Sequence, residues 1–430
     1  MVFLQTFEAR SNEYVGREEG VRSPEPGLRR ALSLPLLTFY GLGTILGAGI
    51  YVLVGEVAGV AGMYAPVAFI SAAFVAAFTA FAYAELAARY PLSGAEAVYV
   101  QEGLQHRGLS TLVGYLIVFS GLVSSATLAR GFVGYLGVFA QFPGAWVIII
   151  LVAALGGLAI WGILESVTIA AVATVIEIGG LLLIIVVSAD SFASLPQRLP
   201  ELIPPADATA WWGIAMGAFL AFYAFIGFED MINVSEEVKN PRRVVPLAIV
   251  LTLIGSTALY LLIVIAAVLA MPPSILAASD APLALLFENA TGASPVLITL
   301  ISLFAVINGA LIQMIMASRM LYGMARSGWA PRLLAKVNDR TRTPVMSTAA
   351  ITLGVLIFAL WLPLVTLAKL TSFAILLVFV LVNLSLIRIK RRYEPPEGIR
   401  VYPLWVPYGG LLLAIALLVL QTLSLAGITR

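Results

Sequence analysis

The sequence predicts an all-α membrane protein whose helices cross the bilayer about eleven times. Of its 430 residues, 61% are hydrophobic and 11% are charged, and the mean hydropathy is +1.00. Because soluble proteins carry about 25% charged residues, this chain has too few charges to cover a surface that faces water. A helix needs about 20 apolar residues to cross the hydrocarbon core. Apolar segments of about that length occur at residues 34–59, 64–89, 109–140, 145–162, 166–189, 210–234, 244–271, 294–325, 345–362, 364–388 and 404–427.

Lysine and arginine residues orient these spans, because cytoplasmic loops carry an excess of them. With residues 1–33 as a cytoplasmic tail, 20 of the 25 basic residues lie in cytoplasmic segments, and only Arg198, Lys369 and Arg430 lie outside. We therefore expect the N-terminus inside and the C-terminus outside. The polar N-terminal tail and the short loops favour a multi-pass protein of a plasma (inner) membrane.

Missing residue types exclude several classes of chemistry. The chain has no cysteine and a single histidine, His106, which lies in a polar loop. Thiolate chemistry, iron–sulfur ligation and histidine-based metal sites therefore lack their usual ligands. The GxxxxGK[ST] phosphate-binding loop of ATP-driven pumps is absent as well. We expect no enzyme activity, metal, cofactor or nucleic-acid partner, and we expect the lipid bilayer and a small molecule as partners.

The first span carries four glycines within the nine residues from Gly41 to Gly49. Glycine inside a helix costs about 1 kcal/mol relative to alanine, so this helix is weakest near its middle. Within a membrane, an opened backbone is tolerated only where it is buried in protein or lines a water-filled cavity. Either the helix opens here, or Gly43 and Gly47 allow a neighbouring helix to pack closely.

The sixth span contains a matching feature. Gly227 lies among aromatic residues and is soon followed by Glu229 and Asp230 inside an apolar run. Five spans separate the two features, and an odd number of spans reverses the second unit in the membrane. Interrupted helices at corresponding places in two inverted halves indicate a substrate site near the membrane midplane. Together the two features favour an opened helix at both places.

Several motifs resemble those of the amino acid–polyamine–organocation (APC) transporter superfamily. Residues Gly43–Ile50 resemble its first-helix glycine motif, and residues 225–229 with 236–246 resemble its sixth helix and the following loop. Further matches lie within residues 83–94 and 324–345. The glutamate–valine–lysine–asparagine–proline run within 236–246 is highly specific for this superfamily, whereas the glycine run alone is not.

The resemblance implies a leucine-transporter-type bundle built from a five-plus-five inverted repeat. Helices 1–5 (residues 34–189) and helices 6–10 (residues 210–388) would form the two halves, with helices 1 and 6 broken. Residues 389–430 would form a loop and a peripheral eleventh helix. Members of the superfamily usually have twelve helices, whereas this sequence predicts eleven. The difference puts dimerisation through peripheral helices in doubt, so the oligomeric state of this chain stays open.

The resemblance also implies where an amino acid binds. The carboxylate of the amino acid would meet backbone N–H groups near Ala48 and Gly49, at a helix end whose dipole favours anions. Its ammonium group would meet carbonyl groups of the two broken helices. The superfamily often has a serine where Ala48 stands, so one hydroxyl contact is absent. Tyr223 is expected to close over the substrate, with packing as the alternative role for each aromatic residue. The predicted substrate-binding set is Thr44, Ile45, Gly47, Ala48, Gly49, Tyr223, Phe225, Ile226 and Gln313.

Charged and amide side chains inside the spans need a reason, because burying them in a membrane is costly. Glu177 in the fifth span corresponds by position to a coupling-ion or proton site of the superfamily, and Asn308 of the eighth span is expected near it. The alternatives are a structural acid or an ion-pair partner for Arg130 or Arg319. Glu229 is the expected gate residue, and helix capping is its alternative role.

These features predict a secondary active transporter that moves amino acids across the membrane by alternating access. A pocket without a fixed acid or base favours neutral amino acids, with proton coupling or exchange. The alternatives are a polyamine or organic-amine exchanger of the same fold and an amino acid sensor that transports nothing.

Overall fold

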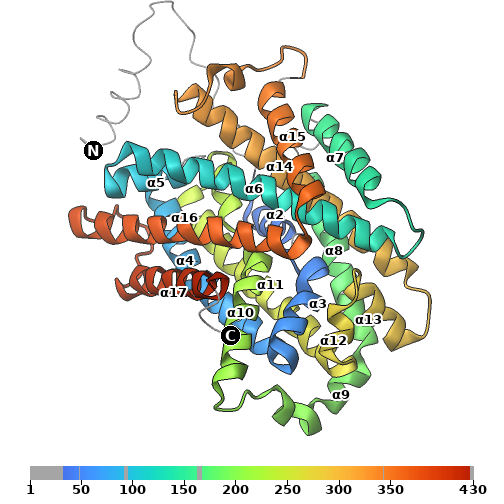
Figure 1. Cartoon of the computed structure of the whole chain (residues 1–430). Coiled ribbons are helices and arrows are strands. Elements are labelled where there is room, and N and C mark those ends of the chain that lie inside the picture. The colour runs from blue at the N-terminus through green and yellow to red at the C-terminus, as the bar shows by residue number, and fades with distance from the viewer. Residues whose placement is uncertain (1–31, 48, 92–94, 162–166, 342, 427–430) are drawn as a thin grey trace, which may run out of the picture.

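A computed structural model describes residues 32–47, 49–91, 95–161, 167–341 and 343–426. Within these residues the chain is almost entirely helical, and its one extended contact is an isolated β-bridge between Leu32 and Val238. The helices pack side by side in one bundle, as Figure 1 shows. The all-α fold class is therefore confirmed over the described residues.

The helices follow one another with short connections. The first half of the described chain contains α2 (Leu34–Leu46), α3 (Ile50–Ala61), η1 (Gly62–Tyr64), α4 (Ala65–Arg89), α5 (Ala95–Leu104), α6 (Arg107–Leu136), α7 (Gly144–Trp161), α8 (Val167–Val187), α9 (Ala189–Arg198) and η2 (Leu199–Leu202). The second half contains α10 (Ala208–Phe222), η3 (Tyr223–Phe225), η4 (Glu229–Glu237), α11 (Pro241–Ala270), α12 (Pro273–Ala277), α13 (Pro282–Thr291), α14 (Val296–Arg326), η5 (Arg332–Ala335), α15 (Val345–Trp361), α16 (Leu364–Arg392) and α17 (Trp405–Leu425).

Eight helical stretches of the described chain are long and apolar enough to cross a membrane, or nine if the bent pair α8 and α9 counts as one span. One of the eight runs for 40 residues from Ile50 to Arg89 and joins α3 to α4. A helix of that length would measure about 60 Å, twice the hydrocarbon thickness, so this stretch has room for two crossings. The shorter helices α2 and α15 are apolar too. The chain is thus a multi-pass membrane protein by composition and length, and the count of eleven spans stays a prediction.

The centre of the bundle is formed by α6, which packs against α14 and α16, and by α4, which packs against α10 and α11. Large apolar side chains are exposed on the outer helices, among them Trp146 and Trp161 of α7, Val186 of α8 and Leu412 of α17. Exposed apolar surface of this extent is unusual for a protein that lies in water. These side chains are expected to face lipid.

Helices α2 and α10 end within the two glycine-containing segments that the sequence singles out. Helix α2 ends at Leu46, and α3 begins at Ile50. Helix α10 ends at Phe222, and after the short turn η3 the chain becomes extended at Ile226, where ψ is 137°. At Gly227 φ is 127°, a value outside the helical range. In both places the α-helical hydrogen-bond ladder therefore stops and the chain changes conformation.

A buried ionic cluster joins α4, α16 and the segment that precedes α17. Glu85 lies 2.8 Å from Arg89 Nη2 and 2.8 Å from Lys390 Nζ, and it accepts a hydrogen bond from the backbone N–H of Tyr402 at 2.9 Å. Lys390 also donates to the carbonyl oxygen of Tyr402. Because a buried charge left without a partner is strongly destabilising, this cluster fixes the approach of α17 to the bundle.

Candidate functional site

The ends of α2 and α10 lie against each other although they are far apart in the sequence. The hydroxyl of Thr44 lies 3.0 Å from the carbonyl oxygen of Gly227, 183 residues away. The hydroxyl of Tyr260 in α11 lies 2.8 Å from the carbonyl oxygen of Ile45 and 2.9 Å from that of Ala224. A hydroxyl donates one proton, so Tyr260 bonds one of these carbonyl oxygens at a time and lies within hydrogen-bond reach of both segments. The two interrupted segments therefore lie side by side.

Glycine is required at two of these contacts. At Gly227, where φ is 127°, a Cβ atom would lie 2.9 Å from the carbonyl carbon and oxygen of Thr44. A Cβ atom on Gly49 would overlap the backbone of Ala224. Glycine alone leaves this space free, and it tolerates positive φ without strain. The two segments can approach each other only because these positions lack a side chain.

Two further residues of the glycine run, Gly47 and Ala48, lie at or next to the predicted carboxylate site. The N–H of Gly47 still donates to the carbonyl oxygen of Gly43, at 3.1 Å, and so continues the hydrogen bonding of α2. Ala48 lies outside the described residues. Of the two positions predicted to meet a substrate carboxylate, the structure therefore places only Gly49, directly before the first turn of α3.

The predicted aromatic residues contact three other helices. The hydroxyl of Tyr223 lies 2.9 Å from the hydroxyl of Ser124 in α6. The ring of Phe225 lies edge-on to Tyr260 and Phe69, with centroid distances of 5.2 and 6.4 Å. Ile226 is buried, and its N–H donates to the carbonyl oxygen of Tyr223. Packing, the alternative role for the aromatic residues, accounts for Phe225, whereas Tyr223 turns its polar group toward α6.

Two buried acids follow the interruption at Gly227. The carboxylate of Glu229 accepts a hydrogen bond from the N–H of Gly227 at 3.0 Å. The carboxylate of Asp230 accepts a hydrogen bond from Nε2 of Gln313 in α14 at 2.8 Å. Glu229 thus accepts the hydrogen bond of a backbone N–H group that lies beyond the end of α10. Gln313 connects α14 to η4 through Asp230.

Glu177 of α8 contacts α14. Its side chain is fully buried, and one carboxyl oxygen accepts a hydrogen bond from Nδ2 of Asn308 at 2.9 Å. The other carboxyl oxygen has no hydrogen-bond partner among the described residues. Its backbone oxygen accepts a hydrogen bond from the hydroxyl of Tyr51 in α3, at 2.7 Å. Arg130, one of its possible ion-pair partners, donates instead to the carbonyl oxygen of Leu360. The structure thus brings Glu177 and Asn308 together and ties them to the helix that follows Gly49.

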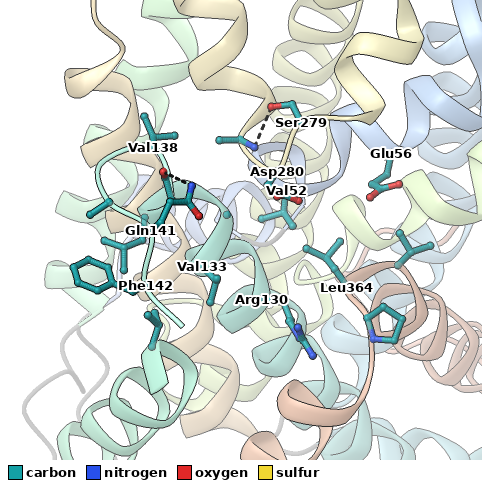
Figure 2. A pocket seen from close by; sticks show the side chains of 18 residues that line it. Val52, Glu56, Arg130, Val133, Val138, Gln141, Phe142, Ser279, Asp280 and Leu364 are labelled. Carbon is teal, nitrogen blue, oxygen red and sulfur yellow. Dashed lines mark hydrogen bonds between the residues drawn. The ribbon is translucent and has the colours of Figure 1, made fainter. Parts of the chain in front are cut away.

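A cavity of about 610 Å³ lies at the end of the bundle where α6 ends and α7 begins (Figure 2). Val52, one turn beyond Gly49, forms part of its wall. Three charged side chains line it from separate elements: Glu56 of α3, Arg130 of α6 and Asp280, which precedes α13. The Nε atom of Arg130 is buried and has no hydrogen-bond partner in the part of the chain that the structure describes. A cavity with charges of both signs suits a small zwitterion.

The sequence alone did not identify this cavity. Glu56 lies near the end of the first apolar span, and Asp280 lies in a predicted loop, where an acid is usually solvated. An acid inside an apolar span is nevertheless costly, and this signal singles out Glu56. Asp280 carries no such signal, because only the folded chain brings it beside α3 and α6.

Comparison with known proteins identifies the family. The amino acid permease family matches residues 32–429. "Cationic amino acid transporter 2, vacuolar" of Arabidopsis thaliana is 31% identical over 86% of this chain and 61% of its own length. "Branched-chain amino acid permease BcaP" of Bacillus subtilis (strain 168) is 28% identical over 86% of this chain and 83% of its own length. "Methylthioribose transporter" of the same strain is 26% identical over 86% and 84%.

The match extends over most of the bacterial relatives, whereas the chain spans only 61 to 65% of the length of the plant cationic transporters. The resemblance drawn from the glycine run and the sixth-span motif is confirmed by the family match. The family and these relatives are transporters, which agrees with the expectation that this chain is not an enzyme. The chain therefore belongs to the amino acid permease family.

Proposed function

We propose that this protein is a secondary active transporter that moves amino acids across a plasma membrane by alternating access. The contact between the two interrupted segments carries the proposal: Gly49 lies against Ala224, and Gly227 lies against Thr44. In secondary transporters, interrupted helices of two halves expose backbone dipoles to a substrate. Membership of the amino acid permease family and the names of the relatives support the substrate class.

The proposed architecture is a five-plus-five inverted repeat of residues 34–189 and 210–388, with residues 1–33 as a cytoplasmic tail and 389–430 as a loop and a peripheral helix. Helices α2 and α3 together form the broken first crossing, and α10 with η4 forms the broken sixth. The N-terminus faces the cytoplasm and the C-terminus faces outside. Under this topology the cavity around Glu56 opens outward.

The proposed substrate is a neutral amino acid. Its carboxylate binds the backbone N–H groups at the start of α3, near Ala48 and Gly49, where the helix dipole favours an anion. Its ammonium group binds carbonyl oxygens of the two interrupted segments, supplied by Thr44, Ile45, Tyr223 and Ile226. Glu229 and Asp230 already accept hydrogen bonds from Gly227 and Gln313, which supports a substrate without a basic side chain.

Cationic amino acids are the second candidate substrates. The similarity to a plant protein named as a cationic amino acid transporter favours them. The two acids in the cavity, Glu56 and Asp280, favour them as well, because they attract a second positive charge.

Counterflow in proteoliposomes tests the function and separates these substrates. Vesicles loaded with unlabelled leucine, valine, lysine, arginine, putrescine or methylthioribose are diluted into the labelled compound. We expect saturable accumulation of the label with a neutral amino acid. Accumulation of lysine or arginine alone would establish the second candidate. Specific binding of an amino acid without flux of any compound would identify a sensor and contradict transport.

Glu56→Gln is expected to weaken uptake from the outside without slowing the transport step. The substitution removes a negative charge from the cavity wall, so the substrate ammonium group is attracted less on its way in. An exposed charge pair contributes about 0.2–1 kcal/mol, so the apparent KM should rise by up to about fivefold at an unchanged maximal rate. Glu288→Gln, at an exposed acid of α13 outside the cavity, serves as the matched control. An unchanged KM in Glu56→Gln would show that the substrate does not enter through the cavity that Glu56 lines.

A further inference from the structure

Helix α5, which connects α4 to α6, carries a buried acid that the transport mechanism above does not use. The side chain of Glu96 is fully buried, and neither of its carboxyl oxygens has a hydrogen-bond partner among the described residues. Leaving an ionised carboxylate unpaired in a protein interior costs several kcal/mol. A carboxyl group in this position is therefore far more stable in its protonated, neutral form.

Two polar groups that interact electrostatically with Glu96 are themselves unsatisfied. The hydroxyls of Tyr83 in α4 and Tyr99 in α5 are both buried without a hydrogen-bond partner among the described residues. The two rings meet edge-on with centroids 6.3 Å apart. Buried polar groups in native proteins are nearly always hydrogen-bonded, so three unsatisfied groups that interact electrostatically need an explanation.

This cluster adjoins the interruption at Gly227. The ring of Tyr83 lies edge-on to Phe228, with centroids 5.7 Å apart. Glu96, Glu229 and Asp230 all interact electrostatically with Tyr83. Because Glu229 accepts the N–H of Gly227, acidic and phenolic groups extend from the interrupted segment to α5.

The titratable groups that interact electrostatically with Glu96 come from three elements. They are Tyr83 of α4, Tyr99 of α5, and Glu229 and Asp230 of η4. Of the two helices that pack against α5, α16 carries Lys390, which Glu85 binds, and α6 begins at Arg107. Burial is the main cause that raises the pKa of Glu96 to about 8, and the negative charge of Asp230 raises it further.

We propose that Glu96 is a proton-binding site at the cytoplasmic end of the transport path, occupied while the packing of α5 against α6 and α16 keeps it buried and emptied when α5 moves away from them. The site rests on the proposed function and its topology, which place α5 on the cytoplasmic side. Movement of α5 away from α6 and α16 would admit water to the carboxyl group and remove the burial that keeps it neutral. The proton would then pass to cytoplasmic water, and no other bond would form or break.

Thermal melting of the purified protein tests whether Glu96 holds a proton. The pKa in the folded state, about 8, lies above the ordinary value of 4.5. The stability that this group contributes is therefore complete below about pH 4.5 and is lost as pH rises toward about 8. We expect the Tm of the wild type to fall over this range more steeply than that of Glu96→Gln, a neutral isostere. Glu102→Gln on the same helix should keep the wild-type slope.

Uptake driven by an imposed pH gradient tests the role of the proton in transport. In proteoliposomes, Glu96→Gln should lose most of the gradient-driven accumulation of the amino acid. Counterflow in the same vesicles corrects for the amount of folded protein, and Glu102→Gln should accumulate substrate like the wild type.

The outcomes separate the proton site from the proposed function. A wild-type melting slope in Glu96→Gln would overturn the proton-binding site. A reduced melting slope with full gradient-driven accumulation would overturn its place in the transport path. Absence of counterflow in the wild type would refute the proposed function, and the melting slopes would still decide whether Glu96 binds a proton.

Discussion

Gly227→Ala is expected to abolish most transport. At φ of 127° an alanine is strained, and its Cβ would lie 2.9 Å from the backbone of Thr44. Strain of this kind costs about 1–3 kcal/mol, and overpacking costs about 1–3 kcal/mol more. If the two segments move apart to relieve it, the site loses its geometry, and a difference of 2 to 4 kcal/mol corresponds to a fall of roughly 30- to 1,000-fold. Counterflow per reconstituted protein molecule measures this loss.

Gly157→Ala is the matched control for this substitution. Gly157 lies inside α7, and a Cβ atom there would meet nothing within 4 Å. Alanine favours a helix by about 1 kcal/mol over glycine, so this variant should fold and transport like the wild type. If Gly227→Ala reached the control rate, the close approach of the two interrupted segments would not be needed for transport, and the central step of the proposed mechanism would be wrong.

The fold class and the two interruptions could be predicted because both depend on local composition. Eleven percent charged residues cannot cover a soluble surface, and four glycines in nine residues weaken any helix that contains them. The ends of α2 and α10 do fall in the predicted segments. Local composition does not indicate which other part of the chain each segment contacts. The contacts of Tyr260 with Ile45 and Ala224 join three elements that are distant in the sequence.

Amide and acidic side chains inside the spans indicated functional or structural positions, as the glycines did. Each of them raises the free energy of a helix within the membrane. Asn308 and Gln313 are five positions apart in one helix and point in different directions. In the structure Asn308 bonds Glu177 of α8, whereas Gln313 bonds Asp230 of η4 rather than lying free for a substrate side chain.

Residues in predicted loops and at span ends could not be assigned in this way. Glu96 belongs to a ten-residue helix between two spans, where an acid is solvated by default. Its complete burial arises from packing of α5 against α6 and α16. Glu85 and Lys390 likewise form their ion pair across 305 positions of the chain. Such partners emerge only from the tertiary fold.

Glu177→Gln is expected to uncouple uptake from the pH gradient. The amide has nearly the same shape as the carboxyl group and can still accept the hydrogen bond that Asn308 donates at 2.9 Å, but it cannot release a proton. We therefore expect loss of most gradient-driven accumulation, measured as substrate uptake at a series of external pH values in proteoliposomes. The rate of counterflow in the same vesicles provides the reference, and Glu288→Gln should retain the wild-type pH dependence.

The position of Glu177 explains how a proton there would act on the substrate site. Its backbone oxygen holds the hydroxyl of Tyr51, and the backbone oxygen of Tyr51 accepts the hydroxyl of Tyr135 at 2.6 Å. A change in charge at Glu177 would therefore affect α3, the helix whose first turn is proposed to receive the substrate carboxylate. If protons cross by way of Glu177 and then Glu96, the double variant should accumulate no less than either single variant. Unchanged pH dependence in Glu177→Gln would instead leave exchange of one amino acid for another as the mode of transport at this site.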